Sequence, residues 1–163
     1  MEFNKSKKIL VIGRAGMDIY PEPPGTKISE VKNFSTHLGG SAANTCVALS
    51  QLGVQSDLLT CVSEDAIGEY IFEKLREFNV GSNLCRRVEN KFQTQVAVVE
   101  TILKNNQSIL YRNNSCDLQL NKNDIDNINF QDYSAVFISG TTLSSNPSRD
   151  AVFYATQKAS SLS

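Results

Sequence analysis

Along most of the chain, continuous apolar runs alternate with segments in which apolar residues recur at helical spacing. Three runs rich in Val, Ile and Leu lack polar alternation, which is typical of parallel strands buried on both faces; they span 7–13, 56–62 and 135–140. Three further segments repeat apolar residues at helical spacing, at 42–52, 63–81 and 146–163. This order predicts an α/β fold, a mostly parallel sheet flanked by helices and joined by right-handed crossovers.

Local signals place the ends of the predicted helices. The segment 42–52 is small or apolar on most faces, so we expect a buried helix, and Gly53 ends it. Asn146 before Pro147 predicts an N-cap followed by proline at the first helical position. A short helix with its own cap is predicted over 121–127.

The middle of the chain breaks this rhythm. Apolar and polar residues alternate loosely over 94–101, a polar turn follows at 104–107, and 108–112 returns as a second strand. This pattern predicts a hairpin and not a strand–helix–strand unit.

A second irregular stretch lies near the N-terminus. Residues 20–32 hold three of the four prolines, which predicts a loop with or without edge strands, and weak alternation over 32–38 predicts a returning strand. We expect two lid segments, near 17–36 and 91–115, to form a small second sheet. That sheet would cover a site or offer an exposed face for dimerisation.

Gly39 and Gly40 lie immediately before the buried helix. Glycine lets a ligand approach the main chain, and the first N–H groups of a helix attract hydroxyl or phosphate oxygens. Asn44, in the first turn, leans back toward the same end of the helix. We expect Gly39, Gly40 and Asn44 to bind a ligand; a plain tight turn with Ser41 as the N-cap is the equal alternative.

Asp18 lies just beyond the carboxyl end of the first predicted strand, where open α/β sheets place ligands. A carboxylate there can accept hydrogen bonds from two hydroxyls of a polyol. The competing interpretation is a turn aspartate that bonds its own backbone. The glycines at 13 and 16 do not form G-x-G-x-x-G, so a dehydrogenase-type nucleotide domain fits poorly.

Two other side chains are candidates. Arg112 follows the hairpin, and its guanidinium suits a carboxylate or an oxygen-rich ligand, although a solvated arginine on an edge strand is the more common case. His37 has no acidic or nucleophilic partner near it in the sequence, so we expect it to be structural.

Composition narrows the classes of function. The chain of 163 residues has a net charge of −1, with no basic tract for nucleic acid and no apolar run of membrane-spanning length. The N-terminus lacks the apolar core of a secretory signal. The four cysteines contain no C-x-x-C pair and there is one histidine, so we expect no metal site and a reduced, cytoplasmic setting.

The glycine segment GGSAAN at 39–44, followed by ALSQLG at 48–53, resembles the N-terminal signature of the ribokinase-like, or PfkB, carbohydrate kinases. The segment 13–18 and the pair Asp65 and Gly68 also match that family. Within it, three segments are most similar to the members that phosphorylate a sugar acid in myo-inositol catabolism: 13–21, 111–118 and 140–149. The resemblance covers nearly the whole chain.

The resemblance implies a ribokinase-like fold and an ATP-dependent kinase, with Mg²⁺, that phosphorylates a primary hydroxyl of a small sugar or sugar acid. The expected substrate is 5-dehydro-2-deoxy-D-gluconate. Asp18 would bind substrate hydroxyls, and Gly39, Gly40 and Asn44 would hold the sugar against the buried helix. Arg112, on the lid hairpin, would face the carbonyl or carboxylate end.

One family motif does not occur in this sequence. The second signature, a glycine-alanine-glycine-aspartate turn, supplies the catalytic base and the anion hole in the family and lies in its C-terminal half. We therefore expect residues 1–163 to form the N-terminal, substrate-binding part of a kinase, truncated, without a catalytic residue of its own and inactive alone. The alternative is a non-catalytic module that binds sugar or forms a homodimer through the lid.

Overall fold

A parallel sheet forms the body of the molecule. The computed structural model describes residues 7–89 and 91–161. Four strands pair in the order β5-β4-β1-β8, all parallel: β5 (Cys85–Val88), β4 (Ser56–Ser63), β1 (Lys8–Ile12) and β8 (Tyr133–Ile138). The unbroken apolar sequences of β1 and β4 follow from their position in the middle of the sheet, where both faces are covered.

Helices cover both faces of this sheet and divide the core in two. On one face, α1 (Ser41–Gln51) and α2 (Ala66–Glu77) pack against the side chains of Ile9 and Val11. On the other face, α3 (Lys122–Asp126) and α4 (Ser148–Ser160) pack against Leu10 and Ile12. The alternation along β1 thus supplies both cores, as the strand period of two requires.

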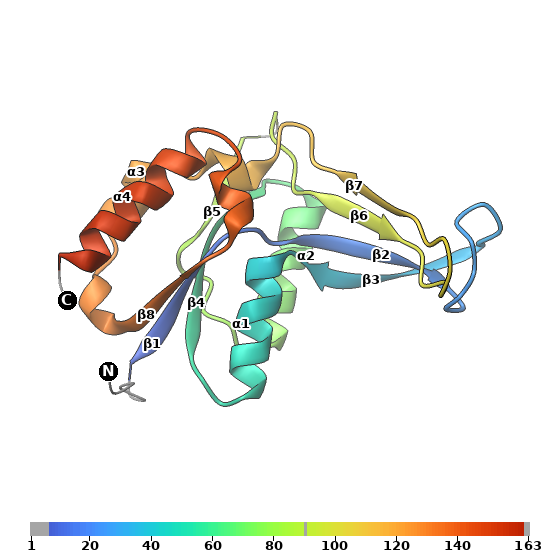
Figure 1. The fold of residues 1–163 in the computed structure, drawn as a ribbon, viewed down its shortest axis with the longest axis horizontal. Coiled ribbons are helices and arrows are strands. Elements are labelled where there is room, and N and C mark those ends of the chain that lie inside the picture. The colour runs from blue at the N-terminus through green and yellow to red at the C-terminus, as the bar shows by residue number, and fades with distance from the viewer. Residues whose placement is uncertain (1–6, 90, 162–163) are drawn as a thin grey trace.

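A second sheet extends away from the body to one side (Figure 1). Its order is β3-β2-β6-β7, with β2 (Gly16–Glu22), β3 (Asn33–Gly39), β6 (Val96–Val99) and β7 (Ser108–Tyr111). β2 pairs antiparallel with β3 and parallel with β6, and β6 and β7 form the predicted hairpin. The expected small second sheet, which we call the lid, is therefore present, and the α/β architecture with a mostly parallel sheet is confirmed. That this sheet covers a site stays a prediction.

Two cap predictions were wrong and one strand was missed. The proline-containing stretch begins as strand, since β2 continues through Glu22 paired with β3, which is the version of the expectation with edge strands. β5 was not predicted. The N-cap of α4 is Pro147 and not Asn146, and the N-cap of α1 is Gly40 without any side-chain cap, so Ser41 does not serve as one. The short helix α3 begins with the predicted cap, in which Asn121 and Asp124 form a reciprocal capping box.

Candidate functional site

Asp18 and Gly39 face each other on the lid sheet, close to the parallel sheet. Gly16 pairs with Gly39 across β2 and β3, and residues two apart in a strand share a face, so Asp18 lies on the same face as both glycines. A Cβ at Gly39 would overlap the carboxylate of Asp18. Gly39 therefore lacks a side chain at the point where the Asp18 carboxylate lies over the main chain.

The environment of Asp18 is partly desolvated and polar. Burial raises the pKa of the Asp18 carboxyl, while the charges of Arg14 and His37 and a hydrogen bond with the Tyr20 side chain act in the opposite direction. Burial also raises the pKa of Tyr20. The ring of Tyr20 meets His37 edge-on, with centroids 5.3 Å apart. Tyr20 and His37 thus border the carboxylate, which is not engaged in a turn with its own backbone as the alternative required.

Gly40 makes the connection from the lid to α1. Its φ is +95°, and a Cβ there would overlap the carbonyl of Arg14, so both the conformation and the space favour glycine. The Ser41 hydroxyl is 2.6 Å from that of Ser139, which in turn lies 3.0 Å from the Thr141 hydroxyl. These hydroxyls join the start of α1 to the carboxyl end of β8.

The first amides of α1 are only partly free for a ligand. The Ala43 amide donates to the Arg14 carbonyl at 3.3 Å, whereas among residues 7–89 and 91–161 the Ser41 and Ala42 amides have no acceptor. The Ala43 amide is therefore not free for a ligand, and binding by the Ser41 and Ala42 amides stays a prediction. Asn44 is exposed, and its own amide donates to the Gly40 carbonyl at 2.9 Å. The contact of its side chain with a ligand stays a prediction.

Arg112 is anchored and not a solvated edge residue. Its Nη2 donates to Asp117 Oδ2 at 2.6 Å and to the Thr141 carbonyl at 3.1 Å. The Asp117 side chain is 2% exposed and also accepts from the Ser115 hydroxyl. Arg112 Nε is buried and has no partner within the described part of the chain. The ion pair thus fixes one edge of the guanidinium and leaves another donor unused.

Two residues at this site were missed by the sequence reasoning. Arg14 follows β1, and its half-buried guanidinium is electrostatically coupled to Arg112, Asp117 and Asp18. Gln95, 2% exposed, lies against Gly16, where a Cβ would overlap its side-chain amide. The available signal for Gln95 was a large amide within an apolar alternation, next to Val96.

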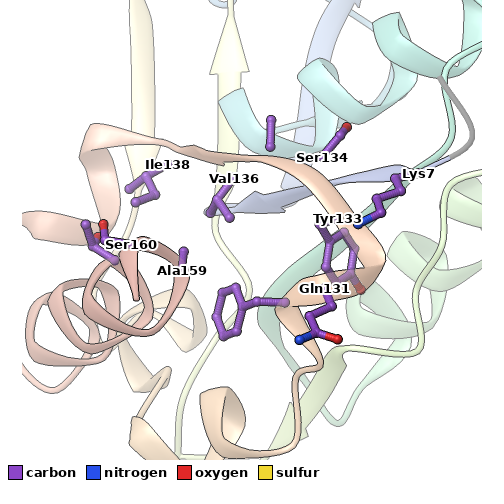
Figure 2. Close-up of a pocket in the computed structure, with 11 residues that line it drawn as sticks. Lys7, Gln131, Tyr133, Ser134, Val136, Ile138, Ala159 and Ser160 are labelled. Atoms are coloured by element: carbon purple, nitrogen blue, oxygen red, sulfur yellow. The ribbon is translucent and has the colours of Figure 1, made fainter. Parts of the chain in front are cut away.

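A separate hollow lies on the body of the molecule. Figure 2 shows Val136 and Ile138 of β8 facing Ala159 of α4. The cavity that they line has a volume of about 430 Å³. It borders the unpaired side of β8 and contains none of the predicted site residues. Within the described ranges, no group of His, Cys, Asp and Glu side chains could hold a metal ion, and no helix is long and apolar enough to cross a membrane.

The comparison with family models identifies the chain. Residues 6–162 match the model of the pfkB family carbohydrate kinases. The chain belongs to this family. Among curated relatives, this pfkB-family chain is 34% identical to the 5-dehydro-2-deoxygluconokinase of Photobacterium profundum over 92% of its length and 34% identical to that of Clostridium perfringens over 95%. The expected similarity to the sugar-acid kinases within the family is confirmed.

Solved structures agree with the fold. An uncharacterized sugar kinase from Pyrococcus horikoshii, 29% identical, superposes with a TM-score of 0.80 over 92% of the pfkB-family chain and 50% of its own. A fructokinase from Xylella fastidiosa gives a TM-score of 0.83 at 22% identity, over 96% of this chain and 48% of its own. The pfkB-family chain spans about half the length of the curated relatives it matches, 45% and 47% for the two above.

Proposed function

We propose that the chain is the substrate-binding part of an ATP-dependent kinase that phosphorylates a primary hydroxyl of 5-dehydro-2-deoxy-D-gluconate. The observation that carries this is the placement of the Asp18 carboxylate over Gly39, with anchored Arg112 coupled to the same site through Arg14. The names of the similar curated proteins support the substrate.

The chemistry of the site suits a polyol acid. The Asp18 carboxylate accepts hydrogen bonds from two hydroxyls, and the bare main chain at Gly39 and Gly40 lets the carbon skeleton lie close to the start of α1. Asn44 adds an amide on the exposed side, and the free edge of Arg112 faces the acid end. These groups bind and orient, which is a large part of catalysis in phosphoryl transfer.

ATP and Mg²⁺ belong to the whole enzyme in this proposal. Similar structures include the Pyrococcus horikoshii sugar kinase in complex with ATP and a putative ribokinase II from E. coli in complex with ATP and Mg²⁺. The glycine-alanine-glycine-aspartate turn does not occur in the 163 residues, so this chain supplies no catalytic base and does not turn over ATP alone. The free cysteines favour a cytoplasmic location, which cell fractionation tests.

Calorimetry on the 163-residue chain tests the proposal. We expect 5-dehydro-2-deoxy-D-gluconate to release heat on binding, Asp18→Ala to abolish that heat, and Glu73→Ala, which removes an exposed carboxylate from α2, to leave it unchanged. Titrations without heat in the unmodified chain, or equal heats in the two variants, would contradict the sugar site. ATP turnover that depends on Asp18 would contradict the claim that this chain is inactive alone.

One observation favours a second function, a dimer formed through the lid. The face of the lid opposite Asp18 carries Ile19, Val98 and Ile109 in register, together with Phe34 and Tyr111, which are 47% and 59% exposed. We expect a dimer in sedimentation that dissociates in the variant Ile109→Lys. A monomer at every concentration would exclude it.

A further inference from the structure

Three side chains at the base of the lid hold polar atoms that nothing in the described structure satisfies. They are Nε of Arg14, Nε of Arg112, and both amide atoms of Gln95. A buried donor or acceptor without a partner destabilises the fold, and more so when the group is charged. Natural proteins keep few such atoms, and each one points to a functional role or to a water or ion that supplies the missing partner.

The register places these groups together. Gly16 and Gly39 are directly opposite each other, the Gln95 amide lies over Gly16, and the Asp18 carboxylate lies over Gly39. Gln95 and Asp18 therefore occupy neighbouring positions on one face of the lid sheet. Arg112 comes two residues after Leu110, which pairs with Ala97, and Ala97 pairs with Asp18, so the hairpin delivers Arg112 toward that same face.

The charges at this point leave one guanidinium without a carboxylate of its own. Asp117 is committed to Arg112 and to the Ser115 hydroxyl. No hydrogen bond joins the Arg14 side chain to Asp18 or Asp117 among the described residues. Burial and the charge of Arg112 lower the pKa of Arg14 more than the charges of Asp117 and Asp18 raise it, so the two carboxylates do not fully offset the cost of placing both guanidinium groups here.

The main chain of Arg14 shows that this side chain is held in place. Its carbonyl accepts from the Ala43 amide and lies against Gly40, so the residue is fixed to the start of α1 through its backbone. The guanidinium has no structural bond within the described chain to explain its half-buried position.

We propose that Arg14 and Arg112 together bind the carboxylate of the substrate, with the Gln95 amide as a neutral third partner, and that this cluster selects sugar acids over neutral sugars. Guanidinium groups match a carboxylate with paired donors, which gives both affinity and orientation. The Asp18 carboxylate then holds hydroxyls farther along the same molecule. The inference rests on the proposed sugar site and adds the residues that read the acid end.

The first experiment observes the arginine Nε–H signals of the unmodified chain by NMR. D-Gluconate and the neutral polyol D-glucitol differ only at the acid carbon, so they form a matched pair of probes. We expect gluconate to shift the Arg14 and Arg112 Nε–H signals and glucitol to leave them in place. Unshifted signals with gluconate would overturn the proposal, even where Asp18-dependent binding of glucitol shows that the sugar site is intact.

The second experiment separates charge from fold. Arg14→Gln should weaken gluconate binding by roughly tenfold or more, because a hydrogen bond to a charged group is lost, and should change glucitol binding by less than about twofold. Arg14→Lys keeps the positive charge but loses the paired N–H donors. Its affinity for gluconate should lie between that of the unmodified chain and that of Arg14→Gln. The control, Arg149→Gln, removes an exposed arginine from α4 and should change neither affinity.

The outcomes distinguish the two proposals. Equal weakening of both ligands by Arg14→Gln overturns the carboxylate cluster, since it indicates a general effect on the site. A third outcome is that the unmodified chain does not bind glucitol, while gluconate still shifts the arginine Nε–H signals and Arg14→Gln removes that shift. This outcome supports the cluster and overturns the polyol role of Asp18. Gln95→Met should weaken gluconate severalfold; an unchanged affinity removes Gln95 from the cluster.

Discussion

At the scale of single residues, the glycine at position 39 leaves room for the carboxylate of Asp18, which is the proposed ligand of the sugar hydroxyls. A side chain at Gly39 would occupy the space of the Asp18 carboxylate. The lack of a side chain at Gly39 therefore allows the negative charge of Asp18 to lie where it does. The same relation holds between Gly16 and Gln95. The two glycines are thus needed for space, whereas Gly40 also needs its positive φ.

Gly39→Ala tests this relation. The new methyl group should displace the Asp18 carboxylate, lower the affinity for the sugar acid by roughly tenfold or more, and destabilise the fold by about 1–3 kcal/mol through overpacking. Calorimetry and urea denaturation measure the two effects. Gly140→Ala is the control, because nothing lies within 4 Å of a Cβ there and its φ is not positive. Equal behaviour of the two variants would show that Gly39 does not position Asp18.

The raised pKa of Asp18 gives a pH-dependent prediction. Folding favours the protonated carboxyl, so the free-energy penalty grows as the pH rises above the ordinary value of 3.8 and is complete once the pH exceeds the raised pKa. Below the ordinary value of 3.8 the group is protonated in the folded and the unfolded chain, and the penalty vanishes. Asp18→Asn should therefore raise the melting temperature at pH 7 and match the unmodified chain near pH 3. Glu73→Gln, at an exposed site, should match the unmodified chain at both pH values. A gain for Asp18→Asn at both pH values would indicate packing and not charge.

At the scale of elements, the lid depends on one buried carboxylate. Glu100 accepts from the Ile28 amide at 2.9 Å and from the Gln107 amide at 3.0 Å, so it joins the proline-containing loop after β2 to the turn between β6 and β7. The Gly25 amide adds a bond to the neighbouring Thr101 hydroxyl at 2.8 Å. These bonds hold the tip of the lid without an apolar core of its own.

Glu100→Ala should release the tip of the lid. We expect the Ile28 and Gln107 amides to exchange with solvent roughly tenfold faster or more, while the cores on either side of β1 keep their protection, because local opening is independent of global unfolding. Hydrogen exchange measured by NMR resolves the individual amides. Glu30→Ala, at an exposed position in the same loop, should leave both rates unchanged. Slow exchange in the Glu100 variant would contradict the role given to its carboxylate.

The elements that were predicted from the sequence are those with a local pattern. β1, β4 and β8 were predicted because their apolar runs are contiguous, and the lid hairpin because its alternation is local. β5 was missed because Arg86 and Arg87 make it look solvated, whereas Arg86 is paired with Asp124 at 2.5 Å, 38 residues away. The same limit applies to the site: Gly39, Gly40 and Asp18 have local signals, but Arg14 and Gln95 acquire meaning only when β2, β3 and the hairpin meet.

At the scale of the whole molecule, coverage of the parallel sheet is uneven. Leu10 in the central strand is fully buried, whereas Phe137 in β8 is 44% exposed on the face that α1 and α2 cover elsewhere. β8 ends the sheet order, so its outer side has no paired strand among the described residues. The hollow between β8 and α4 lies along the same side.

Paired alanine substitutions should reveal this asymmetry. Leu10→Ala is expected to cost roughly 2–5 kcal/mol of unfolding free energy because it leaves a cavity. Phe137→Ala should cost less than half of that, although phenylalanine is the larger side chain, because much of its surface already meets water. Urea denaturation of both variants gives the comparison. A cost for Phe137 equal to that for Leu10 would mean that another chain covers the ring in solution.

The outer side of β8, which pairs with no strand in the described part of the chain, also bears on the fate of the protein in a cell. Unpaired strand edges next to exposed aromatic rings are what holdase chaperones bind and what nucleates aggregates. The cellular abundance of this polypeptide should therefore rise with the concentration of any polypeptide that covers the outer side of β8. Co-production of a shielding polypeptide would then change its half-life more than any substitution at the sugar site.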